Sequence, residues 1–288
     1  MNTTHPAVAI RPTQSTIEDA EALLAVERCS LGDSPYTPAE ALAVLSRAEH
    51  RAYLALVAGQ PVGFCSCLET PATDGPRLEL DMLGVLAEHR GRGIATSLLR
   101  AAMTDARGRG VRHFRGVVAV DNVGSQRAFE RAGLRRDPSP RDLTVLEVLG
   151  DTPLPYLPEG WGADAVLAGV VEAPTRPPLR FDAGGPGREV LRLRDEGGRP
   201  VALAEVQAVH TLAYSGLWLE RHWAASPGAL LALARGLVER ARALGLDEVG
   251  YLAPPRSTDL EEGDEAVTWL RAGYSVVGRY DVYTAGAS

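Results

Sequence analysis

The sequence predicts an α/β protein built from two consecutive domains of one fold. Its 288 residues exceed the usual size of a single domain, which is about 150 residues. The first half alternates strand-like with helix-like patterns of apolar residues. The second half repeats part of that pattern at a shift of 135 residues, which aligns Gly93 with Gly228 and Gly110 with Gly245. Two domains of the same α/β class are therefore expected.

The composition excludes several classes of protein. A hydrophobic fraction of 45% and a charged fraction of 23% are typical of a globular chain. No apolar run approaches the roughly 18 residues of a membrane-spanning helix, and residues 1–12 lack the pattern of an export signal. A cytoplasmic location and no membrane partner are therefore expected. The net charge of −7 argues against nucleic acid as a partner and favours a cationic small substrate.

The three cysteines, Cys29, Cys65 and Cys67, are too few and odd in number for a disulfide framework. Cys65 and Cys67 alternate along one predicted strand, so both side chains are expected on one face as small buried residues. No metal site is expected.

Apolar spacing and capping residues predict the first elements in order. Residues 7–12 form a short strand, and the helix that follows is expected to have Ser15 as its N-cap. Thr37 and Pro38 open a second helix, with proline at the first helical position. Two apolar runs on either side of Gly59 then predict a hairpin.

The next strand, over residues 77–86, leads directly into a loop with two glycines. Beyond the loop, apolar residues at helical spacing begin at Ile94 and predict an amphipathic helix. The remaining elements of this half are a strand over 111–121, a short helix over 125–133 and a final strand over 143–150.

Residues 151–160 contain three prolines and interrupt the periodic patterns, so they are expected to be a linker. The first domain then covers residues 1–150 and the second covers 161–288. The second copy shows no clear pair of helices at its start, which predicts an abbreviated copy. Its helix begins with Ser226 and Pro227, which is capping chemistry and not an anion-binding loop.

The glycine loop of the first half predicts an anion site. Gly91 and Gly93 lie between a strand and the start of a helix, where backbone N–H groups lack partners and the helix dipole is positive. A Walker loop is excluded because the chain has no lysine, and a dinucleotide fingerprint is disfavoured by Thr96. A phosphate or pyrophosphate is the expected occupant, with a merely tight turn as the alternative.

The spacing of residues around this loop resembles that of a known family. Arg90, Gly93 and Ala95 fit the Arg/Gln-x-x-Gly-x-Gly/Ala signature of the GNAT superfamily of acyl-CoA-dependent N-acyltransferases. A second family motif is similar to the segment NVGSQRAFERAGL. The residues that match it are Asn122, Ser125, Phe129, Gly133 and Leu134.

This resemblance implies two tandem domains, each a mixed, mostly antiparallel sheet flanked by helices. The first would keep an acyl-CoA loop, and the second would be degenerate. The cofactor would be acetyl-CoA or another acyl-CoA, held by the loop backbone, by the end of the preceding strand and by the second motif. The implied contact residues are Leu83, Gly84, Val85, Arg90, Gly91, Arg92, Gly93, Ile94, Ala95, Asn122, Ser125 and Phe129.

The resemblance also implies where a catalytic base would lie. Glu79 matches the position of the catalytic glutamate in the histone-acetyltransferase branch, and Asp81 is on the same strand. A solvent-facing strand and deprotonation through water are the alternatives. Many family members carry a tyrosine acid where this chain has Phe129, and phenylalanine has no proton to donate. Water or Ser125 would then supply that proton.

The function implied is transfer of an acetyl or other acyl group from acyl-CoA to an amine of a small molecule or peptide. A coenzyme A-binding regulatory or scaffold protein without turnover is the main alternative, and Phe129 is the observation that favours it. A nucleotide-binding oxidoreductase is a more distant one. The acceptor cannot be read from the sequence, because specificity in such a fold depends on loops without a readable code.

Overall fold

The computed structural model describes residues 7–32, 34–72, 75–148, 153–254 and 264–286. The chain divides into two compact units, each described here by itself. Unit 1 comprises Met1–Pro138, Thr211–Ala213 and Asp281–Ser288, and unit 2 comprises Ser139–His210 and Tyr214–Tyr280. Residues 139–148, expected in the first domain, therefore group with unit 2. The expected limits of the two domains stay predictions.

The sheet of unit 1 has its strands in chain order, from β1 to β5. Neighbouring strands are antiparallel except β4 and β5, which are parallel. A short strand, β6 (Arg135–Arg136), pairs with the end of β15 (Ser275–Ala285). The five main strands are β1 (Val8–Pro12), β2 (His50–Val57), β3 (Gln60–Ala72), β4 (Gly75–Val85) and β5 (His113–Ala119).

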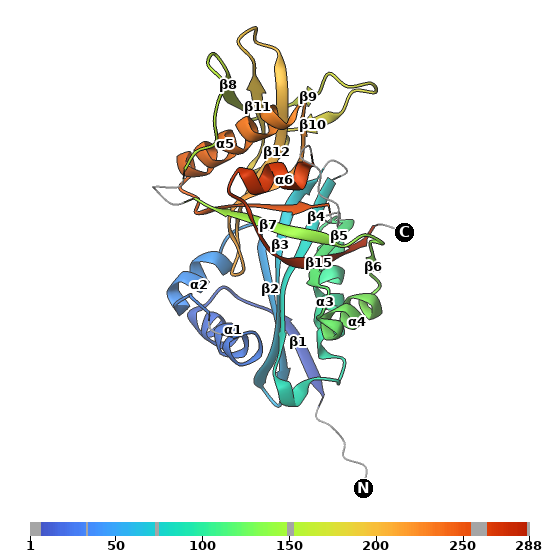
Figure 1. The fold of residues 1–288 in the computed structure, drawn as a ribbon. Helices are drawn as coiled ribbons and strands as arrows, with labels where there is room; N and C mark the ends of the chain where they lie inside the picture. Colours follow the sequence, from blue (N-terminus) through green and yellow to red (C-terminus); the bar gives the residue numbers. More distant parts are fainter. Residues whose placement is uncertain (1–6, 33, 73–74, 149–152, 255–263, 287–288) are drawn as a thin grey trace. The chain divides into compact units, whose positions relative to one another are not determined.

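Helices cover both faces of this sheet (Figure 1). On one face, α1 (Ile17–Ser30) and α2 (Pro38–Leu45) pack with Leu54 and Phe64 in one apolar cluster. On the other face, α3 (Ile94–Gly108) and α4 (Val123–Ala132) pack in a second cluster with buried strand residues. Cys65 and Cys67 are buried in that second cluster with free thiols, as their alternation predicts.

Local capping explains where the helices of unit 1 begin and end. Thr37 and Glu40 form a reciprocal capping box at α2, and Gly133 ends α4 with a positive φ of 100°. The expected N-cap of α1 was wrong by one residue. Ser15 has a positive φ of 53°, and Thr16 caps the helix by accepting a hydrogen bond from the Asp19 amide.

The main strands of unit 2 follow the order β15, β7, β14, β13, β12, β11 and β8. Among the described pairs of these strands, β13–β14 is parallel and the others are antiparallel. A separate antiparallel ribbon joins β9 (Val170–Glu172) to β10 (Arg180–Asp182). The strands named first here are β7 (Arg141–Glu147), β8 (Gly162–Val166), β11 (Arg188–Arg194), β12 (Pro200–His210), β13 (Ser215–Ala224) and β14 (Glu248–Ala253).

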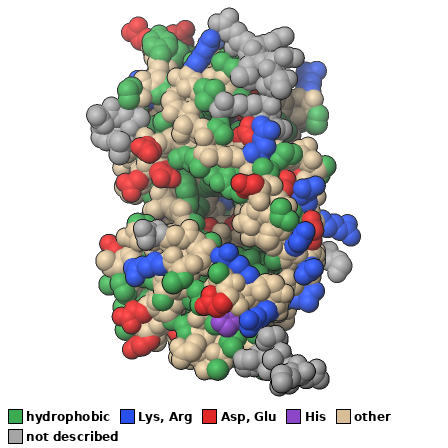
Figure 2. Space-filling model, turned by 60° about the horizontal axis from the view of Figure 1, so that its bottom comes forward, with side chains coloured by type: hydrophobic (Ala, Val, Ile, Leu, Met, Phe, Trp, Pro, Cys, Tyr) green, Lys and Arg blue, Asp and Glu red, His purple; other side chains and the backbone are tan. Residues whose placement is uncertain are grey.

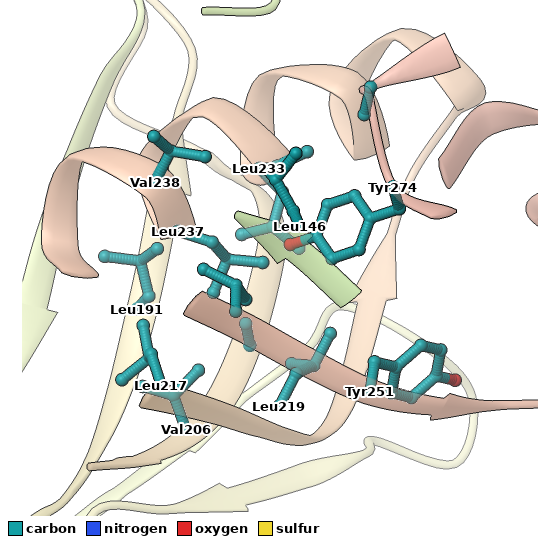
Figure 3. Packing of buried hydrophobic residues seen from close by; sticks show 14 of the residues in the cluster. Leu146, Leu191, Val206, Leu217, Leu219, Leu233, Leu237, Val238, Tyr251 and Tyr274 are labelled. Carbon is teal, nitrogen blue, oxygen red and sulfur yellow. The ribbon is translucent and has the colours of Figure 1, made fainter. Parts of the chain in front are cut away.

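The core of unit 2 forms where α5 (Pro227–Ala243) lies on this sheet, and α6 (Glu265–Arg271) adds Trp269 to the same cluster. Leu233 and Leu237 of α5 point toward Leu146 of β7 (Figure 3). The helix lies between two parallel strands in the chain, as α3 lies between β4 and β5. Both units therefore contain the same strand–helix–strand unit, as the internal repeat predicts.

Within the described residues, no helix is long and apolar enough to cross a membrane. Acidic and basic side chains both occur across the face shown in Figure 2.

Candidate active site

Strands β4 and β5 stop pairing in the middle of β4. Their register runs from Arg77 opposite His113 to Leu80 opposite Gly116, while β4 continues to Val85. Residues Leu83, Gly84 and Val85 pair only with β3 on the other side. The backbone polar groups on the β5 side of this segment can therefore bind an extended ligand as an added strand would.

A β-bulge lies at the point where the two strands separate. Leu80 is opposite Cys67 and Met82 is opposite Ser66, which leaves Asp81 without a partner on β3. The bulge changes which face of the sheet the following side chains occupy. Leu80 belongs to the cluster under α3, whereas Met82 packs against the cluster under α1 and α2.

Asp81 is a buried carboxylate with an unusual affinity for protons. The residue keeps some exposed surface, but its Oδ2 atom is buried and has no hydrogen-bond partner among the described residues. Burial raises the pKa of Asp81 to about 6, the nearby charge of Glu79 adds to this, and a hydrogen bond with the Thr211 side chain opposes it. A carboxylate with this pKa can accept a proton near neutral pH and release it again.

Glu79 lies in a different environment two residues earlier. Its Oε1 accepts hydrogen bonds from Arg77 Nε at 2.5 Å and Thr70 Oγ1 at 3.2 Å, and its Oε2 accepts one from Arg115 Nε at 2.9 Å. The two arginines form partly buried ion pairs with the carboxylate, and the threonine adds a neutral hydrogen bond. Both oxygens of Glu79 thus accept hydrogen bonds, whereas Asp81 Oδ2 accepts none from the described residues.

Replacing Glu79 with glutamine is expected to lower the free energy of unfolding by roughly 1–3 kcal/mol, because two guanidiniums lose their charged partner. Urea denaturation measures this, with the exposed Glu159→Gln as the matched control. The variant's kcat should fall far less than that of an Asp81 variant. A kcat loss of about 100-fold with unchanged stability would return the role of base to Glu79.

The loop after β4 presents unpaired backbone donors. A 3₁₀ turn, η1 (Ala87–His89), leads to Gly91 and Gly93, whose φ angles are +75° and +78°. A Cβ at either glycine would meet nothing within 4 Å, so the space beside the loop is open. Within the described chain, the amides of residues 91–96 donate no hydrogen bond, and the first bond of α3 runs from Ser97 to the Gly93 carbonyl. These amides fit an anion.

Two arginines stabilise this loop from its base. Arg90 donates from Nε to the Val85 carbonyl at 3.0 Å and from its terminal nitrogen to the Ser30 carbonyl at 3.2 Å. Arg92 donates to the Glu88 carbonyl at 2.9 Å. Arg90 therefore joins the loop to the end of α1, and both guanidiniums place positive charge beside the open amides.

The second motif contributes helix-start and packing contacts. Asn122 caps α4 by accepting a hydrogen bond from the Ser125 amide at 3.1 Å. Phe129 is buried over Gly116, where a Cβ would overlap the phenylalanine ring. The Phe129 ring also lies 5.4 Å from that of Tyr283, whose hydroxyl is buried without a partner among the described residues.

Sequence reasoning missed a short segment from the second half that belongs to unit 1. Thr211–Ala213 is the turn between β12 and β13, and Leu212 is buried in the cluster of α1 and α2. Tyr36 Oη donates to the Thr211 carbonyl at 3.1 Å. No local pattern could have paired this turn with Asp81, because the two are far apart in sequence.

Unit 2 keeps the bulge but not the loop. Its bulge lies between Leu219 and Arg221 on β13, at Glu220. Helix α5 starts directly after Ser226, whose side chain accepts a hydrogen bond from the Ala229 amide at 3.1 Å. The predicted capping residues are thus confirmed, and this helix start has a side-chain acceptor where α3 has open amides.

Comparison with known proteins gives a match for part of the chain. Residues 20–134 match the sequence profile of the acetyltransferase (GNAT) family. A search of curated proteins finds no match.

Solved structures resemble the chain over nearly its whole length. A GCN5-related N-acetyltransferase from Sphaerobacter thermophilus aligns over 98% of this chain and 97% of its own, with a TM-score of 0.58 and 15% identity. A tandem GNAT protein from the clavulanic acid biosynthesis pathway aligns over 98% and 99%, with a TM-score of 0.53 and 15% identity.

A glucosamine N-acetyltransferase region of a fungal multi-domain β-N-acetylglucosaminidase aligns over 98% of this chain, with a TM-score of 0.62 and 14% identity. This chain spans only 38% of that fungal chain. At identities of 14% and 15%, these three similarities show the fold alone. One of the three structures is a tandem GNAT protein, and its fold resembles that of this chain.

Proposed function

We propose that unit 1 transfers an acyl group from acyl-CoA to an amine, since residues 20–134 match the profile of the acetyltransferase (GNAT) family. The observation that carries this proposal is the placement of Asp81. Its Oδ2 atom, which has no hydrogen-bond partner in the described part of the chain, lies where β4 and β5 separate, on the strand that leads into a loop of open amides. A base and an anion site on one short segment fit acyl transfer better than binding alone.

The residues present fit acyl-CoA. The amides of residues 91–96, the glycines with positive φ and the charge of Arg90 and Arg92 suit a pyrophosphate. The free edge of Leu83–Val85 suits the amide groups of a pantetheine chain. When bound, acyl-CoA supplies the acyl group in an activated thioester.

Asp81 supplies the proton chemistry. An amine attacks only through its neutral lone pair, so a proton must leave the nitrogen as the new C–N bond forms. Asp81 Oδ2 accepts that proton, and the hydrogen bond from Thr211 holds the carboxyl group in place. As the C–N bond forms, the C–S bond of the thioester would break and coenzyme A would leave as its thiolate. Phe129 has no proton to donate, so this thiolate would take its proton from water.

The proposal is tested by the release of coenzyme A from acetyl-CoA with a panel of small amines and peptides. Turnover that depends on an amine supports it. Tight coenzyme A binding without turnover on any amine would favour a regulatory or scaffold protein. The lack of a hydroxyl at Phe129 is the observation that favours this alternative. Binding of a nicotinamide dinucleotide in place of coenzyme A would overturn both.

A further inference from the structure

A second buried carboxylate lies on the face of unit 1 that also holds Asp81. Glu27 follows Leu23 and Leu24 by one helical turn on the face of α1 that packs on the sheet, and only 4% of the residue is exposed. Its Oε2 atom has no hydrogen-bond partner among the described residues. Burial raises the pKa of Glu27, against a hydrogen bond from Ser34 and the positive charge of Arg28.

Tyr36 lies within electrostatic reach of both carboxylates. After burial, the charges of Asp81 and then Glu27 raise the pKa of the Tyr36 hydroxyl, with a smaller effect from Glu40. The Tyr36 hydroxyl already donates a hydrogen bond to the Thr211 carbonyl at 3.1 Å, so it donates to neither carboxylate. Val26 and Met82, the chain neighbours of Glu27 and Asp81, lie in or against the same apolar cluster as Tyr36 and Leu212. Helix α1, the segment before α2, strand β4 and the 211–213 turn thus enclose one acidic region.

Each of these two carboxylates has one oxygen that receives no hydrogen bond from the described residues. Buried charges in proteins are paired or bind a cation, because an uncompensated one opposes folding. Arg28 is the basic residue that acts on Glu27, but it is exposed and donates to the Tyr36 carbonyl at 3.3 Å. One buried oxygen on Asp81 and one on Glu27 therefore lack a hydrogen-bond donor among the described residues, and a ligand that enters between them would supply one to each.

We propose that the acceptor is a small amine with two basic nitrogens, one held at Asp81 and the other at Glu27. This inference rests on the proposed function and adds the class of acceptor. The nitrogen at Asp81 is the one that is acylated, because that carboxylate lies beside the separated strands. The nitrogen at Glu27 stays protonated and forms a charge-assisted hydrogen bond with Oε2. An acceptor with a carboxylate at this second position would be repelled.

The test compares 1,4-diaminobutane with n-butylamine as acceptors for acetyl-CoA, and repeats the comparison for chains of three to six carbons. A buried charge-assisted contact predicts that kcat/KM for the best diamine exceeds that of its monoamine by roughly 10- to 100-fold. Glu27→Gln keeps the shape and removes the charge, so the ratio should fall toward one. Glu21→Gln, on the exposed side of the same helix, is the matched control and should keep it.

The thermal stability of the Glu27→Gln variant is a second test of the proposed subsite. A carboxylate whose folded pKa is raised opposes folding once it is ionised, so Glu27→Gln should raise Tm at pH 8 by roughly 2–4 °C without ligand. A lower Tm would identify Glu27 as a structural partner of the fold and would count against the subsite.

The outcomes separate this inference from the proposed function. The site for a second nitrogen at Glu27 is excluded if kcat/KM is equal for diamine and monoamine at every length. It is also excluded if Glu27→Gln leaves the ratio of the two values unchanged. Neither result affects the proposal of acyl transfer. If no amine is acylated, the proposed function fails, and calorimetry with the same diamines decides the subsite. Diamine binding that Glu27→Gln abolishes supports the subsite, and no binding to the wild type overturns it.

Discussion

Asp81→Asn is expected to lower kcat by about 10²- to 10⁴-fold and to make the protein more stable at pH 8. The loss of activity follows because an amide cannot accept the proton that leaves the amine. The gain in stability follows because the variant removes a buried charge whose Oδ2 has no partner among the described residues. A shift of the pKa from 3.8 to about 6 corresponds to about 3 kcal/mol at most.

The direction of the pKa shift of Asp81 determines how the stability of the protein depends on pH. The folded pKa of Asp81 is raised, so its contribution to stability is complete below about pH 3.8 and is lost as the pH rises through about 6. The advantage of Asp81→Asn should therefore be largest at pH 8 and vanish near pH 4 in urea denaturation. Wild-type kcat should fall below about pH 6 as Asp81 is protonated.

The exposed Asp121→Asn serves as the matched control and should change neither quantity. An Asp81→Asn variant with full kcat and an unchanged acidic limb would exclude Asp81 as the base. Loss of stability at pH 8 would mean that the carboxylate has a partner in the folded protein.

Gly93→Glu is expected to weaken coenzyme A binding by about 100-fold or more, because it brings a negative charge to the positive end of α3. Gly93 has a φ of +78°, so any side chain there is strained even though a Cβ would meet no atom within 4 Å. Gly93→Ala introduces the same strain without the charge and should lose much less affinity. Calorimetry with coenzyme A measures both variants.

The same titration tests how many sites the chain has. One coenzyme A per chain is expected, because α5 begins with a Ser226 cap where α3 begins with open amides. Gly228→Glu, at the matching position of the second copy, should leave binding unchanged. Two molecules bound per chain would contradict this assignment, and a Gly93→Glu variant with wild-type affinity would refute the loop itself.

Much of the fold could be predicted because its signals are local. The Thr37–Glu40 capping box, the glycine at the end of α4 and the apolar spacing of α3 each depend on residues within one or two turns. The N-cap of α1 was missed because Ser15 and Thr16 are chemically equivalent as caps, and only the backbone angle of Ser15 separates them. The family's sequence motifs located the loop for the same local reason.

The candidate site was predicted only in part because its electrostatics depend on distant residues. Glu79 and Asp81 look alike in the sequence, and what separates them is the placement of Arg115 and Thr211. Glu27 has a signal in the sequence, since it is an acidic residue on the apolar face of a helix. The bulge at Asp81 has no sequence signature, because it is a feature of the pairing between β3 and β4.

Unit 1 is not one continuous stretch of chain, because it takes Thr211–Ala213 and Asp281–Ser288 from beyond residue 138. Leu212 lies in the cluster of its first two helices, and Tyr283 lies in the cluster beneath α3. A gene fragment that stops after residue 138 would therefore encode an incomplete unit. Because the segments of the two units alternate along the chain, no single cut in the gene separates one whole unit from the other.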